Sequence, residues 1–203
     1  MVAIVDYGVG NLFSLCSSLA AIGVKAKVTA DPDEIRAADR VILPGVGAFG
    51  DAAAKLRATG LDKVLIAEAK AGKPLMGICL GMQMLFEKSY EYGCHEGLGL
   101  LRGSVVAMEG MLPETLKIPH IGWNALTFTR PDCPLFAHIR EGEHVYFVHS
   151  FHARFCEDSL AAVTEYGIDL TAVVAKGNVF GCQFHPEKSG QTGLAILKAF
   201  CEV

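Results

Sequence analysis

The sequence predicts an α/β protein with a mostly parallel sheet flanked by helices, followed by an antiparallel or mixed annex in its second half. Two observations predict this fold class. Up to about residue 90, short β-branched runs alternate with helical patterns, which is typical of βαβ units and a parallel sheet. After Gly97, short strand-like runs are instead broken by glycine and proline. We expect helices to cover both faces of the parallel part.

In the first half, each expected strand is a short apolar run and is followed by a longer helical pattern. The expected strands are 2–6, 24–29, 40–43 and 74–78. The expected helices are 11–22, an acidic stretch beginning at Asp31, helices within 52–70, and 80–88. This spacing leaves room for a crossover helix between successive parallel strands.

The second half predicts strands packed beside the same sheet. The strand-like runs are 99–108, 118–128, 144–153, 160–166 and 170–184, and a last helix is expected over 191–200. No linker, internal repeat or low-complexity tract divides the chain. We therefore expect residues 1–203 to form a single domain.

Composition excludes several classes of protein. The 203 residues carry 18 Lys and Arg against 22 Asp and Glu, a net charge of −4, and 51% are hydrophobic. This composition excludes a disordered chain and argues against nucleic acid as a main ligand. The most apolar stretch, 74–86, is too short for the roughly 20 residues that a membrane span needs. The first residues lack a basic patch and include Asp6, so we expect no secretory signal and a cytoplasmic chain.

The cysteines and glycine loops predict neither a metal nor a cofactor. Seven cysteines, no two closer than 15 positions, exclude C-x-x-C motifs and argue against a disulfide framework. Cys133 with His138 is too small a set for zinc. The loop at Gly8–Gly10 resembles a dinucleotide fingerprint, but Phe13 stands where the third glycine belongs, which disfavours a nicotinamide cofactor.

The best candidate nucleophile is Cys79, in the pattern Gly77-Ile-Cys-Leu-Gly81 between an apolar strand and a helix. This pattern is the thiol form of the elbow that presents a nucleophile at the carboxyl edge of a sheet. The positive end of the helix would favour the thiolate, and the N–H of Leu80 would point where an oxyanion forms. The alternative is one more core cysteine in an ordinary turn.

Candidate partners of this thiol lie elsewhere in the chain. His185 and Glu187 are separated by one proline, so both side chains can project to the same side and act as a base and its orienting carboxylate. Gln83 lies one helical turn after Cys79, where its amide would bind a polar substrate or simply face solvent. A glycine loop over 44–47 would complete an oxyanion site or form an ordinary turn.

With these residues in place, the chain resembles the triad-type, or class I, glutamine amidotransferases. Within this class, the chain most resembles the branch that serves imidazole glycerol phosphate synthase in histidine biosynthesis. It runs nearly end to end, and the segments that carry it are 6–12, 43–49, 77–83, 119–124, 146–150 and 183–189. It implies a flavodoxin-like fold and the hydrolysis of glutamine to glutamate and ammonia.

The resemblance also implies roles for individual residues. Cys79 would attack the side-chain amide of glutamine, His185 would transfer protons and Glu187 would orient it. The backbones of Val46 and Leu80 would donate to the oxyanion. Four positions match those around bound glutamine: Gly47, Gln83, His149 and Ser150. Four others match an interface with a partner subunit: Asn11, Trp123, Tyr146 and Lys188.

The implied partner is a barrel-shaped cyclase subunit in a one-to-one heterodimer, which would receive the ammonia and form imidazole glycerol phosphate and an aminoimidazole carboxamide ribotide. Three alternatives stay open at this point. They are an amidotransferase subunit of another pathway, of the anthranilate or GMP type, a γ-glutamyl hydrolase, and a non-catalytic regulatory subunit on the same fold.

Overall fold

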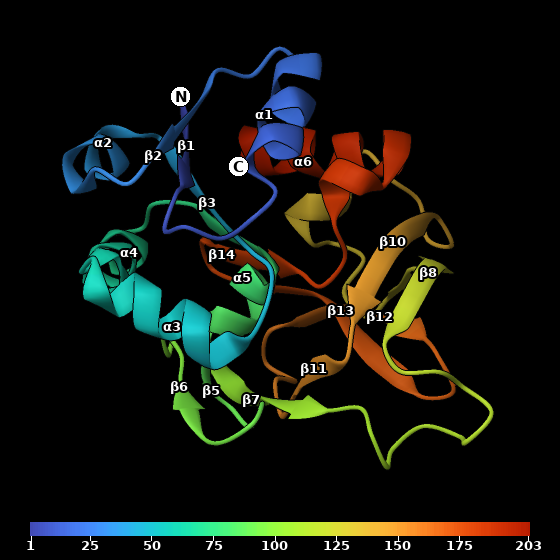
Figure 1. The fold of residues 1–203 in the computed structure, drawn as a ribbon. Helices are drawn as coiled ribbons and strands as arrows, with labels where there is room; N and C mark the ends of the chain where they lie inside the picture. Colours follow the sequence, from blue (N-terminus) through green and yellow to red (C-terminus); the bar gives the residue numbers. More distant parts are fainter.

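The computed structural model describes residues 1–203, and Figure 1 shows its elements. The strands are β1 (Val2–Val5), β2 (Ala26–Thr29), β3 (Arg40–Gly45), β4 (Leu75–Cys79), β5 (Phe86–Ser89), β6 (His95–Glu96), β7 (Leu101–Ala107), β8 (His120–Ala125), β9 (Thr127–Phe128), β10 (His144–His149), β11 (Phe151–Arg154), β12 (Leu160–Glu165), β13 (Asp169–Lys176) and β14 (Val179–Cys182). The helices are α1 (Leu12–Ala21), α2 (Pro32–Ala37), α3 (Phe49–Ala58), α4 (Leu61–Lys70), α5 (Leu80–Met84) and α6 (Gly190–Glu202), with short 3-10 helices η1 (Pro134–Phe136) and η2 (Pro186–Lys188).

An eight-stranded sheet forms the centre of the molecule, in the order β2-β1-β3-β4-β14-β13-β12-β9. Its first four strands are parallel, as predicted, and β14 pairs parallel with β4. Strands β13, β12 and β9 then extend it in antiparallel fashion. Four strands of the second half therefore continue the main sheet, whereas the sequence predicted that they would pack beside it. Two smaller sheets, β10-β8 and β11-β7-β5-β6, make up the rest of the annex.

Helices cover both faces of the sheet, as predicted. Alternate residues of β1 point to opposite faces: Ala3 and Val5 belong to one buried cluster, and Val2 and Ile4 to the other. The first cluster includes side chains of α2, α3 and α4, and the second includes side chains of α1 and α6. Figure 1 shows α1 and α6 side by side, away from α3 and α4. None of the helices is both long and apolar enough to cross a membrane.

The helix expected over 80–88 ends at Met84, so this part of the prediction was wrong. Backbone N–H groups of residues 97–101 donate to the carbonyl oxygens of Met84, Leu85, Phe86 and Glu87. Phe86 then begins β5, which pairs with β7. Non-local hydrogen bonds thus satisfy the carbonyl groups that follow Gln83, and Phe86 is buried in the strand that they help to hold.

Three runs predicted as single strands are each divided in two. Residues 144–153 cross from β10 to β11 in another sheet, and 118–128 divide into β8 and β9. Residues 170–184 divide at Gly177, whose φ of +58° suits a tight turn. The turn reverses the chain, so β14 runs antiparallel to β13 and pairs with β4 along its other edge.

Candidate active site

Three neighbouring parallel strands end at the same place and bring distant residues together. The register pairs Gly45 at the end of β3 with Cys79 at the end of β4. On the other side of β4, Cys182 at the end of β14 pairs with Ile78. The loop after β3 and the segment after β14 therefore flank Cys79, at the carboxyl edge where open α/β sheets bind ligands.

Cys79 occupies a sharp turn from β4 into α5. Its φ of 54° and ψ of −111° are unusual for a residue other than glycine, which is the strain found at nucleophile elbows. A Cβ atom on Gly81 would lie 1.8 Å from the carbonyl oxygen of Leu43, and one on Gly77 would lie 2.5 Å from the carbonyl oxygen of Gly81. Glycine at both positions lets the two backbone segments approach this closely.

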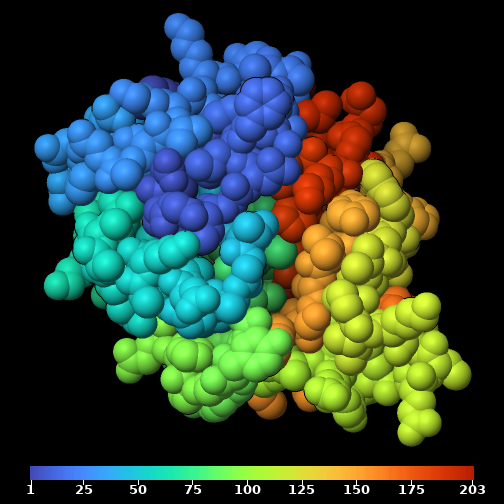
Figure 2. Space-filling view, viewed as in Figure 1, coloured from blue at the N-terminus to red at the C-terminus, as the bar shows by residue number.

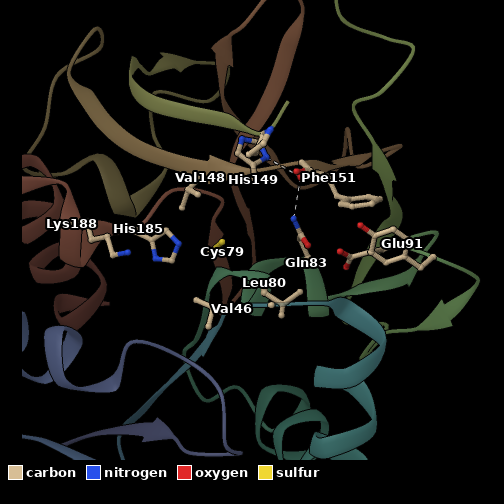
Figure 3. Close-up of a pocket in the computed structure, with 14 residues that line it drawn as sticks. Val46, Cys79, Leu80, Gln83, Glu91, Val148, His149, Phe151, His185 and Lys188 are labelled. Carbon is tan, nitrogen blue, oxygen red and sulfur yellow. Dashed lines mark hydrogen bonds between the residues drawn. The ribbon is translucent and has the colours of Figure 1, made fainter. Parts of the chain in front are cut away.

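His185 and Glu187 form a buried pair beside this turn. His185 Nδ1 lies 2.8 Å from Glu187 Oε1, and both side chains are 3% exposed. The backbone of His185 is fixed as well, because its N–H donates to the carbonyl oxygen of Tyr146 and its carbonyl oxygen accepts from the Ser189 hydroxyl. Figure 3 shows the imidazole directed toward Cys79. The structure thus brings together the three side chains singled out from the sequence.

The electrostatics of this cluster favour a charged imidazole. Burial disfavours the imidazolium of His185, but hydrogen bonding and the negative charges of Cys79 and Glu187 outweigh it and raise the pKa of His185 from 6.5 to about 9. At neutral pH the arrangement therefore places a positively charged imidazole beside the sulfur of the candidate nucleophile.

This raised pKa predicts a pH-dependent stability. Because folding raises the pKa of His185, the pair stabilises the folded chain fully below pH 6.5 and loses that contribution as pH rises through about 9. We expect the unmodified chain to have a larger free energy of unfolding than His185→Asn at pH 6.5. This difference is expected to decrease, on the order of a few kcal/mol, between pH 6.5 and 9.5. Urea unfolding at several pH values measures the difference.

The exposed His144 provides the control. His144→Asn is expected to differ from the unmodified chain by the same small amount at every pH in this range. A difference for His185→Asn that does not change with pH would contradict the raised pKa.

A pocket of about 400 Å³ opens over Cys79. Its lining comes from the loop after β3, from α5, from residues 91–92, from the β10–β11 connection and from the segment after β14: Val46, Gly47, Cys79, Leu80, Gln83, Glu91, Tyr92, Pro119, Val148, His149, Ser150, Phe151, His185 and Lys188. Figure 2 shows cyan, green and orange segments meeting near the centre of one face. Eight of the nine residues predicted for catalysis, for the oxyanion site and for glutamine binding line this pocket. The ninth, Glu187, does not line it and instead contacts His185 Nδ1.

One wall of the pocket is held by a chain of hydrogen bonds. The carbonyl oxygen of Phe151 lies 3.1 Å from Gln83 Nε2 and 2.8 Å from His149 Nδ1 (Figure 3). A carbonyl oxygen only accepts, so His149 carries its proton on Nδ1. Burial lowers the pKa of His149 to about 3, and a neutral ring is consistent with that tautomer. His149 Nε2 contacts His120 Nδ1 at 3.1 Å, so both ring nitrogens of His149 are engaged within the protein.

Two of the four residues predicted at a partner interface form an aromatic pair, in which Trp123 is exposed and Tyr146 is partly buried. Trp123 on β8 and Tyr146 on β10 are paired across the two-stranded sheet, with ring centroids 6.0 Å apart. Trp123 is 52% exposed and Ile121, two positions earlier, is 58% exposed. The single Trp is thus on the surface. Asn11 precedes α1, and Lys188 is exposed at the rim of the pocket.

Sequence reasoning missed two polar residues of the site. Glu91 lines the pocket and accepts a 2.6 Å hydrogen bond from the backbone N–H of Phe49, but its segment has no periodicity that would have singled it out. Gln183 is fully buried beside Cys79. Its position two residues before His185 was the available signal, because such residues project to the same side of an extended chain. No group of three or more His, Cys, Asp or Glu side chains is placed to hold a metal ion.

The comparison with known proteins agrees with this fold. A family model for class-I glutamine amidotransferases matches residues 3–203. The chain therefore belongs to the class I glutamine amidotransferases. It is 52% identical over 204 residues to the imidazole glycerol phosphate synthase subunit HisH of Caldanaerobacter subterraneus subsp. tengcongensis, covering 100% of this chain and 98% of that one. Within its class it belongs to the family of these HisH subunits, which confirms the resemblance drawn from its motifs.

Other relatives support the same assignment. HisH of Sulfurimonas denitrificans is 49% identical over 203 residues, covering 98% of this chain and 97% of that one. Among solved structures, PurLQS from Thermotoga maritima has a TM-score of 0.78 at 22% identity, covering 99% of this chain and 97% of that chain. That likeness shows the fold, a mixed α/β architecture with a mostly parallel central sheet.

Proposed function

We propose that this chain is the glutaminase subunit of an imidazole glycerol phosphate synthase, which hydrolyses glutamine to glutamate and ammonia and passes the ammonia to a cyclase subunit. The observation that carries the proposal is the buried pair of His185 and Glu187 directed at Cys79 on its strained turn. The family supports the same chemistry. We take residues 1–203 as one amidotransferase domain, because two core clusters cover the two faces of the same sheet.

In the proposed mechanism, the thiolate of Cys79 attacks the carbonyl carbon of the glutamine side chain. Backbone N–H groups of Val46 and Leu80, which line the pocket, are proposed to stabilise the oxyanion. His185 gives its proton to the departing nitrogen, so ammonia leaves and a thioester remains. His185 then takes a proton from water, which attacks the thioester and releases glutamate and the Cys79 thiolate. Glu187 holds the imidazole in the required tautomer.

The pocket also offers groups for the rest of the substrate. Gln83 uses its amide nitrogen on Phe151 and Gln183, which leaves its amide oxygen to accept a hydrogen bond from glutamine. The Glu91 carboxylate, which also lines the pocket, is suited to pair with the ammonium group of an amino acid. Gly47 and Ser150 complete the proposed contacts, and His149 acts through the carbonyl oxygen of Phe151.

Labelling with a glutamine-like electrophile, such as a diazo ketone analogue of glutamine, tests this function. We expect covalent modification at Cys79, identified by mass spectrometry, and protection by added glutamine. The exposed Cys94 is the internal control. Any modification of Cys94 is expected to be the same with and without added glutamine. Absence of Cys79 labelling, even with the cyclase subunit present, would contradict the proposal and favour a non-catalytic scaffold.

We further propose a one-to-one heterodimer with a barrel-shaped cyclase, docked on the face that carries Trp123, Tyr146, Asn11 and Lys188. The exposed Trp123, which packs against the partly buried Tyr146, supports this surface, and Lys188 places it next to the pocket mouth. A docked partner there would receive ammonia before it becomes ammonium in water. We assign the chain to the cytoplasm, because all seven cysteines are free and a reducing compartment keeps thiols in that state.

Truncation of Trp123 tests the docking surface. An exposed tryptophan at an interface is a frequent hot spot, so we expect Trp123→Ala to weaken cyclase binding by roughly 30-fold. Because Trp123 is half exposed in the chain alone, the free energy of unfolding should change little. Calorimetric titration with the cyclase measures the affinity. Phe155→Ala, which removes another exposed aromatic ring outside this surface, is expected to bind normally, and equal affinities for both variants would contradict the assignment.

A further inference from the structure

Gln183 has no role in the mechanism above, although it is fully buried against the nucleophile. It follows β14 and precedes His185 by two residues. Its Nε2 lies 3.7 Å from Cys79 Sγ, and its Oε1 lies 3.0 Å from Gln83 Nε2. We propose that Gln183 is a further catalytic residue, whose side-chain amide donates a hydrogen bond to the sulfur of Cys79 and stabilises its thiolate. This inference rests on the proposed function, because it concerns the same nucleophile.

The orientation of the Gln183 amide is dictated by its neighbours. The carbonyl oxygen of Phe151 only accepts, so the amide group of Gln83 must turn its nitrogen toward it. That same nitrogen donates its second hydrogen to the oxygen of Gln183. The nitrogen of Gln183 is therefore left facing the sulfur. If the Gln183 amide were reversed, two donors would meet at Gln83 and an oxygen lone pair would face the thiolate.

Further contacts hold the Phe151 end of this series of hydrogen bonds in place. The Phe151 carbonyl oxygen also accepts from His149 Nδ1, and His149 in turn contacts His120. Gln83 and Gln183 are 5% and 0% exposed, so water does not compete for these hydrogen bonds. The donor is thus oriented before any substrate arrives.

A hydrogen-bond donor at this position stabilises negative charge on the Cys79 sulfur. Cys79 is only 8% exposed, and burial of a charge is costly unless hydrogen bonds or an opposite charge offset it. His185 provides the opposite charge on one side, and the amide of Gln183 provides a neutral donor. A neutral donor stabilises the thiolate without competing with His185 for the proton that must reach the leaving nitrogen.

Gln183→Met tests this role, because methionine keeps the length and volume of the side chain but has no N–H. The probe is iodoacetamide, a small neutral electrophile that needs no glutamine recognition, applied to the full chain from pH 5 to 10. Modification at Cys79 is followed by mass spectrometry, which separates it from the other cysteines. We expect the midpoint of the pH profile to rise by about one unit, and the rate at pH values below that midpoint to fall about tenfold.

Cys182→Ala is the matched control. It removes a buried side chain from the last position of β14, directly before Gln183, and this side chain makes no hydrogen bond to the Cys79 sulfur. It is expected to cost stability but to leave the midpoint unchanged. A merely structural role for Gln183 would lower stability in the same way without moving the midpoint, and that result would overturn the inference.

If Gln183→Met does not fold, an NMR titration of the unmodified chain tests the inference instead. In the ¹⁵N-glutamine-labelled protein, a side-chain amide proton of Gln183 is expected to shift with pH at the same midpoint as Cys79 alkylation. An unchanged resonance would overturn the inference. The two proposals fail differently: unlabelled Cys79 and absent glutaminase activity contradict the proposed function, whereas normal activity with an unmoved midpoint contradicts only the role of Gln183.

Discussion

Cys79→Ser is expected to reduce the turnover of glutamine in the complex with the cyclase by about 10⁴-fold. A serine hydroxyl in this position keeps the shape of the turn, but it is far harder to deprotonate than a thiol, and removing one member of a catalytic triad typically costs this much. Coupled measurement of glutamate formation gives the rate. The free energy of unfolding is expected to stay within about 1 kcal/mol of the unmodified chain.

Cys94→Ser is the matched control for this prediction, because Cys94 is an exposed free cysteine. It should leave turnover unchanged. Retention of a substantial part of the activity by Cys79→Ser would mean that another group attacks the substrate.

Gly81→Ala is expected to have the largest effect on stability, more than about 4 kcal/mol, or to prevent folding. A Cβ atom on Gly81 would lie 1.8 Å from the carbonyl oxygen of Leu43, which belongs to the backbone of β3 and cannot rotate away. Strand β3 would have to move away from α5, and the loop after β3, which carries Val46, would move with it. Soluble yield and urea unfolding measure the effect.

Gly50→Ala is a useful comparison, since Gly50 lies within α3 and the atoms nearest to its added Cβ belong to the His95 ring, the closest at 2.7 Å. That ring can move, and alanine favours the helix over glycine by about 1 kcal/mol. A small change is expected there. Equal stability losses at Gly50 and Gly81 would show that backbone contact is not what requires glycine in the turn.

Local motifs were sufficient to predict the nucleophile and its partners as candidates. The turn at Cys79 follows from glycines on both sides of a residue between an apolar strand and a helix. The pairing of His185 with Glu187 follows from their spacing across a proline. In both cases the relevant geometry is set within five residues, so the sequence contains it. The catalytic roles of these residues stay predictions until the variants are measured.

Contacts between distant segments could not be predicted in the same way. Periodicity does not give strand order, so the insertion of β14 beside β4 and the meeting of Gln83 with Gln183 were not foreseen. The helix expected through Lys88 fails for the same reason, because acceptors near Phe86 are satisfied by residues 97–101. Trp123 shows the converse: a residue type that is usually buried lies on the surface here, because it faces outward from a two-stranded ribbon.

The order of the strands also bears on how the protein is made. Cys79 leaves the ribosome more than a hundred residues before His185, and β14 must enter the sheet before an imidazole stands beside the sulfur. If the proposed mechanism holds, a growing chain has the thiol without its base and is expected to consume no glutamine during synthesis. Loss of the last twenty residues would remove His185, Glu187 and α6 together, so the proposed mechanism predicts that hydrolysis begins only when nearly the whole chain has been translated.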